Sequence, residues 1–316
     1  MLRRLLVLLV ACAPLAAQAQ YPNKPVRIVL QFPAGGLADT VIRVLANPLS
    51  QSFGQPVVVD NKPGADGAIA GETVKAAPPD GYTLFFATNS ALSATPVLRK
   101  KPPYDPVADF TPITFVGRFP FFVFAHPSLQ VKSVQELIAQ ARAHPGKLNY
   151  GSGNTTSILA TAQLASLAKL DMVHIPYKGD APLMQDLVAG RIHFAIASTA
   201  PAAGLAKDGK LKVLGTLGAR RSNLFPDAPT MAESGFPQYS VIPWGAMVGP
   251  AGMPREIVDR VARDTHAALT NAQVKENLDK FGFELQGSSS DELGKFIREQ
   301  LAAWRQAVKE AGIQPD

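Results

Sequence analysis

The stretch Val26-Arg27-Ile28-Val29-Leu30, followed by Phe32-Pro33-Ala34-Gly35-Gly36-Leu37-Ala38-Asp39, decides the fold of this 316-residue chain. Its first five residues are mostly apolar and β-branched, which predicts a short buried strand. After the glycine pair, apolar residues recur at helical spacing: Val41, Ile42, Val44, Leu45 and Leu49. The stretch therefore predicts a strand, a glycine turn and a helix.

A glycine turn at a helix start suits an anionic ligand. Glycine lets the backbone approach a ligand closely, and the first N–H groups of a helix have no partner within the helix. They also lie at the positive end of the helix dipole. The alternative is a tight connection that binds nothing. The candidate ligand-binding residues of this turn are Phe32, Ala34, Gly35, Gly36 and Asp39.

The strand and helix signals continue to alternate, which is typical of an α/β fold with a mostly parallel sheet. Val57-Val58-Val59 leads into the glycine-rich loop at residues 60–67, and the strand at residues 82–87 ends in Thr88-Asn89-Ser90. Ligands of open α/β sheets bind beyond the carboxyl ends of the strands. Asn89 and Ser90 therefore join the candidate site.

The second half of the chain repeats this arrangement with more hydroxyl groups. The strand Leu148-Asn149-Tyr150 meets Gly151-Ser152-Gly153-Asn154-Thr155-Thr156-Ser157, and a helical pattern follows. Two later strands lead to Lys178-Gly179-Asp180 and to Ser198. The candidate residues of this half are Ser152, Asn154, Thr155, Thr156, Lys178, Gly179, Asp180 and Ser198.

The first 19 residues predict a cleavable export signal. Arg3 and Arg4 precede the apolar run at residues 5–10, and Ala17-Gln18-Ala19 is a small-x-small cleavage site. Cys12 lies within this segment and is the one cysteine of the sequence. Residues 9–12 also loosely resemble a lipoprotein box, so lipidation at Cys12 is the alternative. We expect a periplasmic, soluble and monomeric mature protein without disulfides.

Composition and charge indicate a globular protein that does not bind nucleic acid. Hydrophobic residues make up 47% of the chain and charged residues 18%, which predicts a globular protein with a sizeable core. The formal charge is +6, and removal of Arg3 and Arg4 leaves +6 − 2 = +4 on the side chains. This mild, dispersed surplus does not indicate nucleic-acid binding.

We find no catalytic or metal-binding constellation in the sequence and expect no cofactor. The five histidines are scattered, and there is no His-Glu-x-x-His, Walker or Gly-x-Gly-x-x-Gly motif. Gly151-Ser152-Gly153 does not fit a nucleophile elbow. Asp39 is a conceivable general base, but an acid near a helix start is more often structural. Two sets of donor-rich turns suit binding better than catalysis, so the chain is predicted not to be an enzyme.

Several motifs in order resemble one family. They are Tyr21-Pro22-x-Lys24-Pro25-Val26-Arg27, the turn at residues 32–39, residues 61–67, residues 79–84, Phe110-Thr111-Pro112-Ile113, Pro176-Tyr177-Lys178-Gly179 and the segment at residues 244–254. This set is similar to the solute-binding proteins of tripartite tricarboxylate transporters, the Bug or TctC family, over essentially the whole mature chain.

The resemblance implies a type II periplasmic binding protein: two α/β lobes joined by two crossing strands. We place residues 20–122 and 243–316 in one lobe and residues 123–242 in the other. The resemblance also implies that a carboxylate is held between the lobes and delivered to the membrane permease subunits. The alternatives are a periplasmic sensor that docks on a signalling partner, and a secreted hydrolase or isomerase on the same scaffold. Because few cations line the turns, we expect a small mono- or dicarboxylate, or its amide-bearing relative, rather than a tricarboxylate.

We predict cleavage after Ala19, so mass spectrometry of exported protein should find Gln20 as the first residue. A diacylated peptide that begins at Cys12 would instead identify the lipoprotein site.

Overall fold

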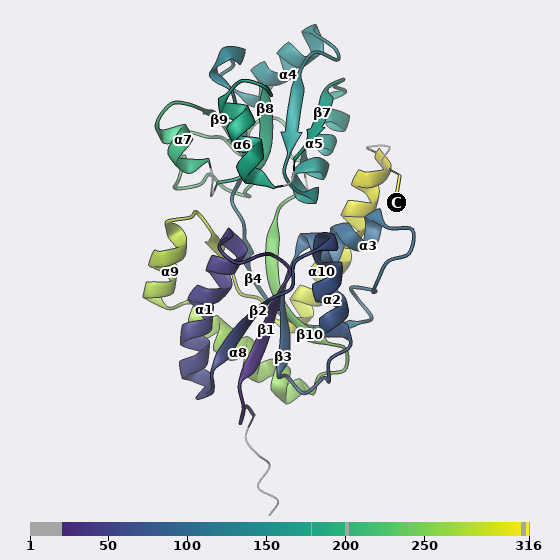
Figure 1. Cartoon of the computed structure of the whole chain (residues 1–316), viewed down its shortest axis with the longest axis vertical. Coiled ribbons are helices and arrows are strands. Elements are labelled where there is room, and N and C mark those ends of the chain that lie inside the picture. Colours follow the sequence, from purple (N-terminus) through teal and green to yellow (C-terminus); the bar gives the residue numbers. More distant parts are fainter. Residues whose placement is uncertain (1–20, 178, 200–201, 240, 311–313, 316) are drawn as a thin grey trace, which may run out of the picture.

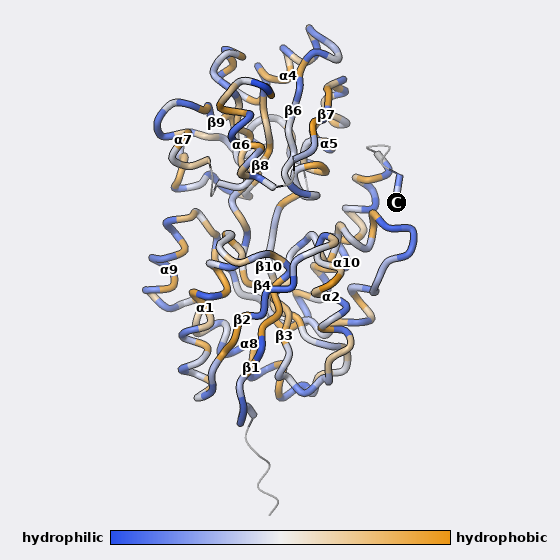
Figure 2. Tube along the Cα trace, in the orientation of Figure 1, coloured by the Kyte–Doolittle hydropathy of each residue, from blue (hydrophilic) through white to orange (hydrophobic). Residues whose placement is uncertain are grey.

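The computed structural model describes residues 21–177, 179–199, 202–239, 241–310, 314 and 315, and contains two sheets, each covered by helices (Figure 1). We call the six-stranded sheet with its helices the first lobe, and the five-stranded sheet with its helices the second lobe. Figure 2 shows hydrophobic residues recurring along the strands of both lobes.

The first lobe has the strand order β11-β4-β10-β3-β1-β2. Its strands are β1 (Val26–Leu30), β2 (Val57–Asn61), β3 (Thr83–Thr88), β4 (Phe110–Arg118), β10 (Trp244–Pro250) and β11 (Glu284–Leu285). Its helices are α1 (Leu37–Phe53), α2 (Ala68–Lys75), α3 (Thr95–Leu98), α8 (Arg255–Leu269), α9 (Ala272–Asp279) and α10 (Ser290–Glu310), with the short turns η1 (Ala65–Gly67) and η2 (Ser90–Ala94). Helices α1 and α8 cover one face of the sheet, and α2 and α10 cover the other (Figure 1).

The second lobe has the strand order β7-β6-β8-β5-β9. Its strands are β5 (Phe121–Ala125), β6 (Asn149–Ser152), β7 (Val173–Pro176), β8 (Phe194–Ser198) and β9 (Lys212–Thr216). Its helices are α4 (Val134–Ala143), α5 (Thr155–Ala168), α6 (Asp180–Val188) and α7 (Ala203–Lys207), with the short turn η3 (Pro127–Leu129).

The strand and helix expected from the opening stretch form as predicted. β1 pairs in parallel with β2 and β3, and Val26, Ile28, Val29 and Leu30 are fully buried in it. The apolar face of α1 packs into the same core, and Gly54 ends the helix with a left-handed backbone (φ 65°). Every residue of β3 is buried, as expected for a strand covered on both faces.

The chain passes between the lobes twice. It leaves the first lobe between β4 and β5, through Phe119 and Pro120, and returns before β10, through residues 241–243. The N–H of Phe119 donates to the carbonyl of Pro243 over 3.0 Å, so the two crossing segments are bonded to each other. Phe121 and Phe122 already pair with β8 in the second sheet. The lobe boundaries drawn from the sequence remain predictions.

This topology makes the carboxyl ends of two sets of parallel strands face each other. β1, β2 and β3 run toward the second lobe, and β6, β7 and β8 run toward the first (Figure 1). The turns that follow these strands therefore lie between the lobes.

Tyr21 fixes the chain at the opposite end of the first sheet. Its hydroxyl donates to the carbonyl of Gly81 over 2.7 Å, and its ring packs against Tyr82 and Phe53. This contact lies before β1 begins, at the amino end of the strand.

Within the described residues, no helix combines the length and apolar character that a membrane span requires.

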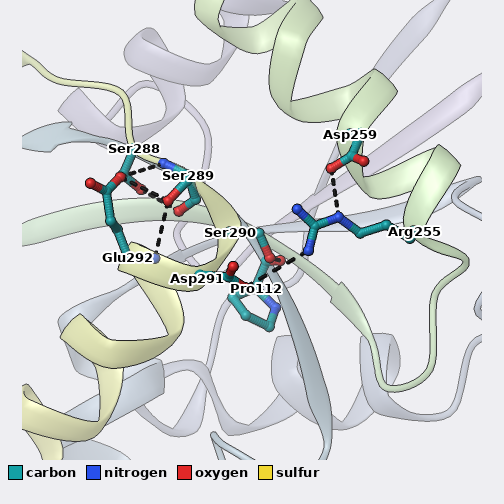
Figure 3. Close-up of polar contacts among 8 residues, drawn as sticks. All are labelled: Pro112, Arg255, Asp259, Ser288, Ser289, Ser290, Asp291 and Glu292. Carbon is teal, nitrogen blue, oxygen red and sulfur yellow. Dashed lines mark hydrogen bonds and ion pairs between the residues drawn. The ribbon is translucent and has the colours of Figure 1, made fainter.

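The sequence Ser289-x-x-Glu292 matches a capping box, and this box starts α10. The Ser289 hydroxyl accepts from the N–H of Glu292 over 3.2 Å, and the Glu292 carboxylate accepts from the N–H of Ser289 over 2.8 Å (Figure 3). Next to it, the Ser290 hydroxyl donates to the carbonyl of Pro112, and Arg255 bridges Asp259 and Asp291. These contacts fix the helix start against β4 and α8.

We predict that Ser289→Ala lowers the free energy of unfolding by about 1 kcal/mol, because the N–H of Glu292 loses its acceptor. Urea unfolding followed by circular dichroism measures this, and Ser289→Thr, which keeps a hydroxyl, should stay near the wild type. An alanine variant as stable as the wild type would show that the cap contributes nothing.

Candidate ligand-binding site

The turn after β1 presents backbone to the space between the lobes. Ala34, Gly35 and Gly36 are exposed, whereas Phe32 is half-buried. Gly35 has a left-handed backbone (φ 88°), a conformation that favours glycine, and Gly36 has an extended backbone immediately before α1. The glycine pair therefore forms the helix start that the sequence indicates.

Asp39 shapes this turn from beneath. One oxygen of its buried carboxylate accepts from the N–H of Gly35 over 3.0 Å and from Nε of Arg43 over 2.9 Å. The other accepts from Nδ2 of Asn61 over 2.9 Å, and this amide also donates to the carbonyl of Phe32. Asp39 is among the ligand contacts predicted from the sequence, and that contact stays a prediction; its carboxylate accepts hydrogen bonds within the turn. The geometry gives it a positioning role.

The electrostatics of Asp39 agree with this role. Burial of the carboxyl group acts to raise the pKa of Asp39, but hydrogen bonds from Arg43, Gly35 and Asn61 outweigh burial and hold it below its ordinary value. Asp39 is therefore ionised at neutral pH, and Arg43 is committed to it.

A buried amide that the sequence analysis did not single out organises the neighbouring strand ends. Oε1 of Gln31 accepts from the N–H of Thr88 over 3.2 Å, which links the ends of β1 and β3. A Cβ on Gly67 would come within 2.8 Å of Nε2 of Gln31, so the loop before α2 packs directly on this amide. In the sequence, the position of the polar Gln31 directly after the apolar strand would have indicated this role.

In the second lobe, Asn154 caps α5. Its Oδ1 accepts from the N–H of Ser157 over 3.0 Å, and its Nδ2 donates to Asp180 over 3.0 Å. Thr155 and Thr156, the first residues of α5, are buried. A ligand contact of Asn154 stays a prediction. Its side chain organises the helix start and leaves backbone N–H groups of the first turn as donors.

Ser152 is engaged inside the second lobe. Its hydroxyl shares a hydrogen bond of 2.6 Å with Nε2 of His174, whose ring stacks on Tyr150. Burial lowers the pKa of His174, which favours the neutral ring. The Ser152 hydroxyl, predicted as a ligand donor, thus contacts β7.

Asp180 connects the remaining candidates of the second lobe. Its carboxylate accepts from the Ser198 hydroxyl over 2.6 Å and from Asn154. Burial raises the pKa of Asp180, although the hydrogen bonds from Ser198 and Asn154 act to lower it. A Cβ on Gly153 would lie 2.3 Å from this carboxylate, which requires glycine there. Gly179 precedes α6 with a left-handed backbone (φ 108°), and Lys178 lies outside the described residues.

Asn89 joins the two lobes. Its Nδ2 donates to the Thr156 hydroxyl over 2.9 Å, and its Oδ1 accepts from the N–H of Trp244 over 3.3 Å. All three residues are buried. The neighbouring Ser90, also buried, begins η2. The structure thus brings together the candidates that follow β3 and those that begin α5.

A cavity of about 250 Å³ lies next to this junction, between the lobes. The residues that line it are Asp66, Thr95, Leu98, Arg99, Thr155, Ile158, Leu159 and Gln314. Of the residues predicted from the sequence, Thr155 lines it. The other lining residues were missed because segments far apart in the sequence meet at this cavity, which leaves no local pattern.

The geometry offers neutral donors and a helix dipole to an anion, without a metal. Among the described residues, no group of three or more histidine, cysteine or acidic side chains could hold a metal ion. The N–H of Ser157 is used by the cap, and that of Ile158 donates to the carbonyl of Asn154. Thr155 and Thr156 therefore provide the backbone donors at the start of α5.

A family model described as the tripartite tricarboxylate transporter family receptor matches residues 41–313. The chain belongs to this family. The receptor is 34% identical to protein BugT of Bordetella pertussis over 307 residues, which cover 96% of this chain and 93% of BugT. The family resemblance predicted from the sequence motifs is confirmed.

Solved structures of relatives confirm the fold class. The R. palustris protein Rpa4515 with adipate matches with a TM-score of 0.83 and 32% identity, over 94% of this receptor and 100% of that chain. MatC of Rhodopseudomonas palustris with bound malate matches with a TM-score of 0.79 and 28% identity, over 91% and 100% of the two chains. The receptor has the two-lobe α/β fold of periplasmic binding proteins and is a solute-binding protein by family, as predicted.

We predict that Asp39→Asn destabilises the receptor by about 1–3 kcal/mol at pH 7, because an amide replaces an anion that accepts from Arg43 and Gly35. Urea unfolding at several pH values measures this.

The sign of the pH effect follows from the lowered pKa of Asp39. The stabilisation is present above the unfolded value, about 3.9, and is lost as the pH falls through the folded value. The gap between wild type and variant should therefore close in acid. A gap that stays constant from pH 7 to pH 3 would contradict this assignment.

Proposed function

We propose that this receptor captures a small carboxylate between its lobes in the periplasm and delivers it to the membrane permease subunits of a tripartite tricarboxylate-type transporter. The single observation that carries the proposal is the cavity between the lobes, which is lined by η1 and α3 of the first lobe and by the start of α5 of the second. A ligand there contacts both lobes at once.

The start of α5 supports an anionic ligand. Thr155 lines the cavity at the first position of the helix, where unpaired N–H groups and the helix dipole favour negative charge. The turn before α1 provides a second helix start of the same kind. A carboxylate held by these donors needs no metal and no large cluster of cations.

The charge of the ligand follows from the cations that are already paired. Arg43 is bonded to Asp39 and Asn61, and Arg27 is paired with Asp60. Neither is available to compensate a highly charged ligand, whose desolvation would be costly. The relatives crystallised with adipate and malate agree with a small mono- or dicarboxylate.

The remaining parts of the proposal are the location and the partners. Export through the signal at residues 1–19, a monomeric mature protein and a role without catalysis are consistent with a family of periplasmic receptors. Asp39 and Asp180, the acids nearest to the predicted turns, are bonded within their own lobes. That arrangement supports positioning of the turns rather than acid–base chemistry.

We predict that a panel of carboxylates includes one that raises the melting temperature of the mature receptor. A ligand present at 100 times its dissociation constant adds about 2.7 kcal/mol of stability. Uncharged amides of the same acids should not stabilise it. A panel in which no carboxylate changes the melting temperature would remove the basis of the proposal.

We further predict that Thr155→Val weakens binding of that carboxylate by about 1 kcal/mol, roughly fivefold, because the cavity wall loses a hydroxyl. Titration calorimetry measures the change. Thr73→Val is the control, because the Thr73 hydroxyl bonds to the Ile69 carbonyl within α2. Equal affinities of wild type and Thr155→Val would place the ligand elsewhere.

A further inference from the structure

A second cavity lies on the first lobe, between the end of β4 and the start of α10. It is lined by Phe115 and Arg118 of β4, by residues 286–288 and by one face of the first turns of α10. Its volume of about 340 Å³ is in the range of small-molecule sites. It shares no lining residue with the cavity between the lobes among the residues that the structure describes. We call this separate cavity the α10 groove.

Aromatic rings form the apolar wall of the α10 groove. The rings of Phe115 and Phe296 meet edge to face with their centroids 5.2 Å apart, and Phe296 meets Trp244 in the same way over 5.1 Å. Leu293, which also lines the groove, is fully buried. Phe296 is half-buried, so it still offers ring surface to a ligand. Such a wall suits another aromatic ring, which can pack against it in an offset or edge-to-face arrangement.

Arg118 places a positive charge beside this wall. Its guanidinium lies over the Phe115 ring, 5.2 Å from the centroid, and donates to the side-chain oxygen of Gln286. Among the described residues, no carboxylate oxygen lies within 4.0 Å of it, and Glu284, opposite Arg118 on β11, is paired with Arg220 over 4.0 Å. Burial lowers the pKa of Arg118, whereas Glu284 acts to raise it, and a guanidinium stays charged at neutral pH. The group is thus partly desolvated and lacks an ion-pair partner.

The acids that line the α10 groove are already engaged. Glu292 accepts from the N–H and the hydroxyl of Ser289, each over 2.8 Å, in the capping box (Figure 3). Glu299 pairs with Lys295 over 3.8 Å. Each of these carboxylates has a donor or a cation of its own, so Arg118 is the charge that the groove offers to a ligand.

We propose that the α10 groove is a second binding site of the receptor and takes an aromatic carboxylate, with the carboxylate on Arg118 and the ring against Phe296 and Leu293. A guanidinium presents parallel N–H groups that match a carboxylate, and this charge-assisted pairing is stronger where the guanidinium is already partly desolvated. The rings of the wall add aromatic contacts that a saturated ring cannot make. This site goes beyond the proposed transport function and does not depend on it.

The test uses phenylacetate as the probe and titration calorimetry on the mature receptor. Phenylacetamide has the same shape without the charge, and cyclohexylacetate has the charge without the aromatic ring. We expect phenylacetate to bind about tenfold more tightly than phenylacetamide, because the amide cannot form the charge-assisted pair. We expect it to bind about threefold more tightly than cyclohexylacetate, because the saturated ring lacks the aromatic contacts.

Matched variants locate the bound probe. Arg118→Gln should weaken phenylacetate binding about tenfold, since glutamine has no charge to pair with the carboxylate. Phe296→Leu, which keeps an apolar side chain, should weaken it about threefold. Arg298→Gln is the control and should bind as the wild type does, because Arg298 is an exposed arginine of α10 that does not line the groove. Melting curves establish that each variant is folded.

The outcomes separate this site from the cavity between the lobes. Wild-type affinity in Arg118→Gln, or a loss confined to Arg99→Gln, which alters the wall of the cavity between the lobes, would overturn the second site. So would the absence of phenylacetate binding, or equal binding of phenylacetamide. Equal binding of cyclohexylacetate would overturn the aromatic assignment. The transport proposal is judged separately, by the Thr155→Val variant at the other cavity.

Discussion

The amide of Asn89 is the interaction on which the arrangement of the two lobes depends. It is buried, and it accepts from the backbone of β10 and donates to the first turn of α5. Leaving a buried amide without one of its partners costs more free energy than the net gain from forming that hydrogen bond. The end of β3, the start of β10 and the start of α5 therefore keep their relative positions. The helix start that faces the cavity is thus placed by the end of a strand in the other lobe.

Around this junction, the carboxylates of Asp39 and Asp180 organise their own turns through hydrogen bonds. Asp39 gathers N–H donors from its own turn, and Asp180 ties Ser198 to the cap of α5. Each carboxylate accepts hydrogen bonds from neighbouring side chains, so those donors are already used within the protein. The donors that remain for an anion are the backbone N–H groups at the helix starts, whose positions are fixed by the helices.

Local patterns predicted the parts of the structure that depend on contacts a few residues apart. The strand at Val26–Leu30, the helix after the glycine pair and the Ser289 capping box follow from neighbouring residues. The role of Asp39 did not, because its partner Asn61 lies 22 residues away on another strand. The cavity wall was missed for the same reason: Arg99 and Thr155 are far apart in the sequence and line one cavity only in the folded chain. Only the folded chain pairs such residues.

The anchoring of Tyr21 at the amino end of β1 sets how the molecule can be attached to something else. Its bond to Gly81 lies at one end of the first sheet, and the turns between the lobes lie at the other, a strand length of about 16 Å plus the turns away. A tether at this end therefore leaves the space between the lobes on the side away from the attachment point. A receptor attached to a sensor chip through a tether before Tyr21 would keep the space between its lobes open to solute. A fluorophore fused at the same end would lie away from that space.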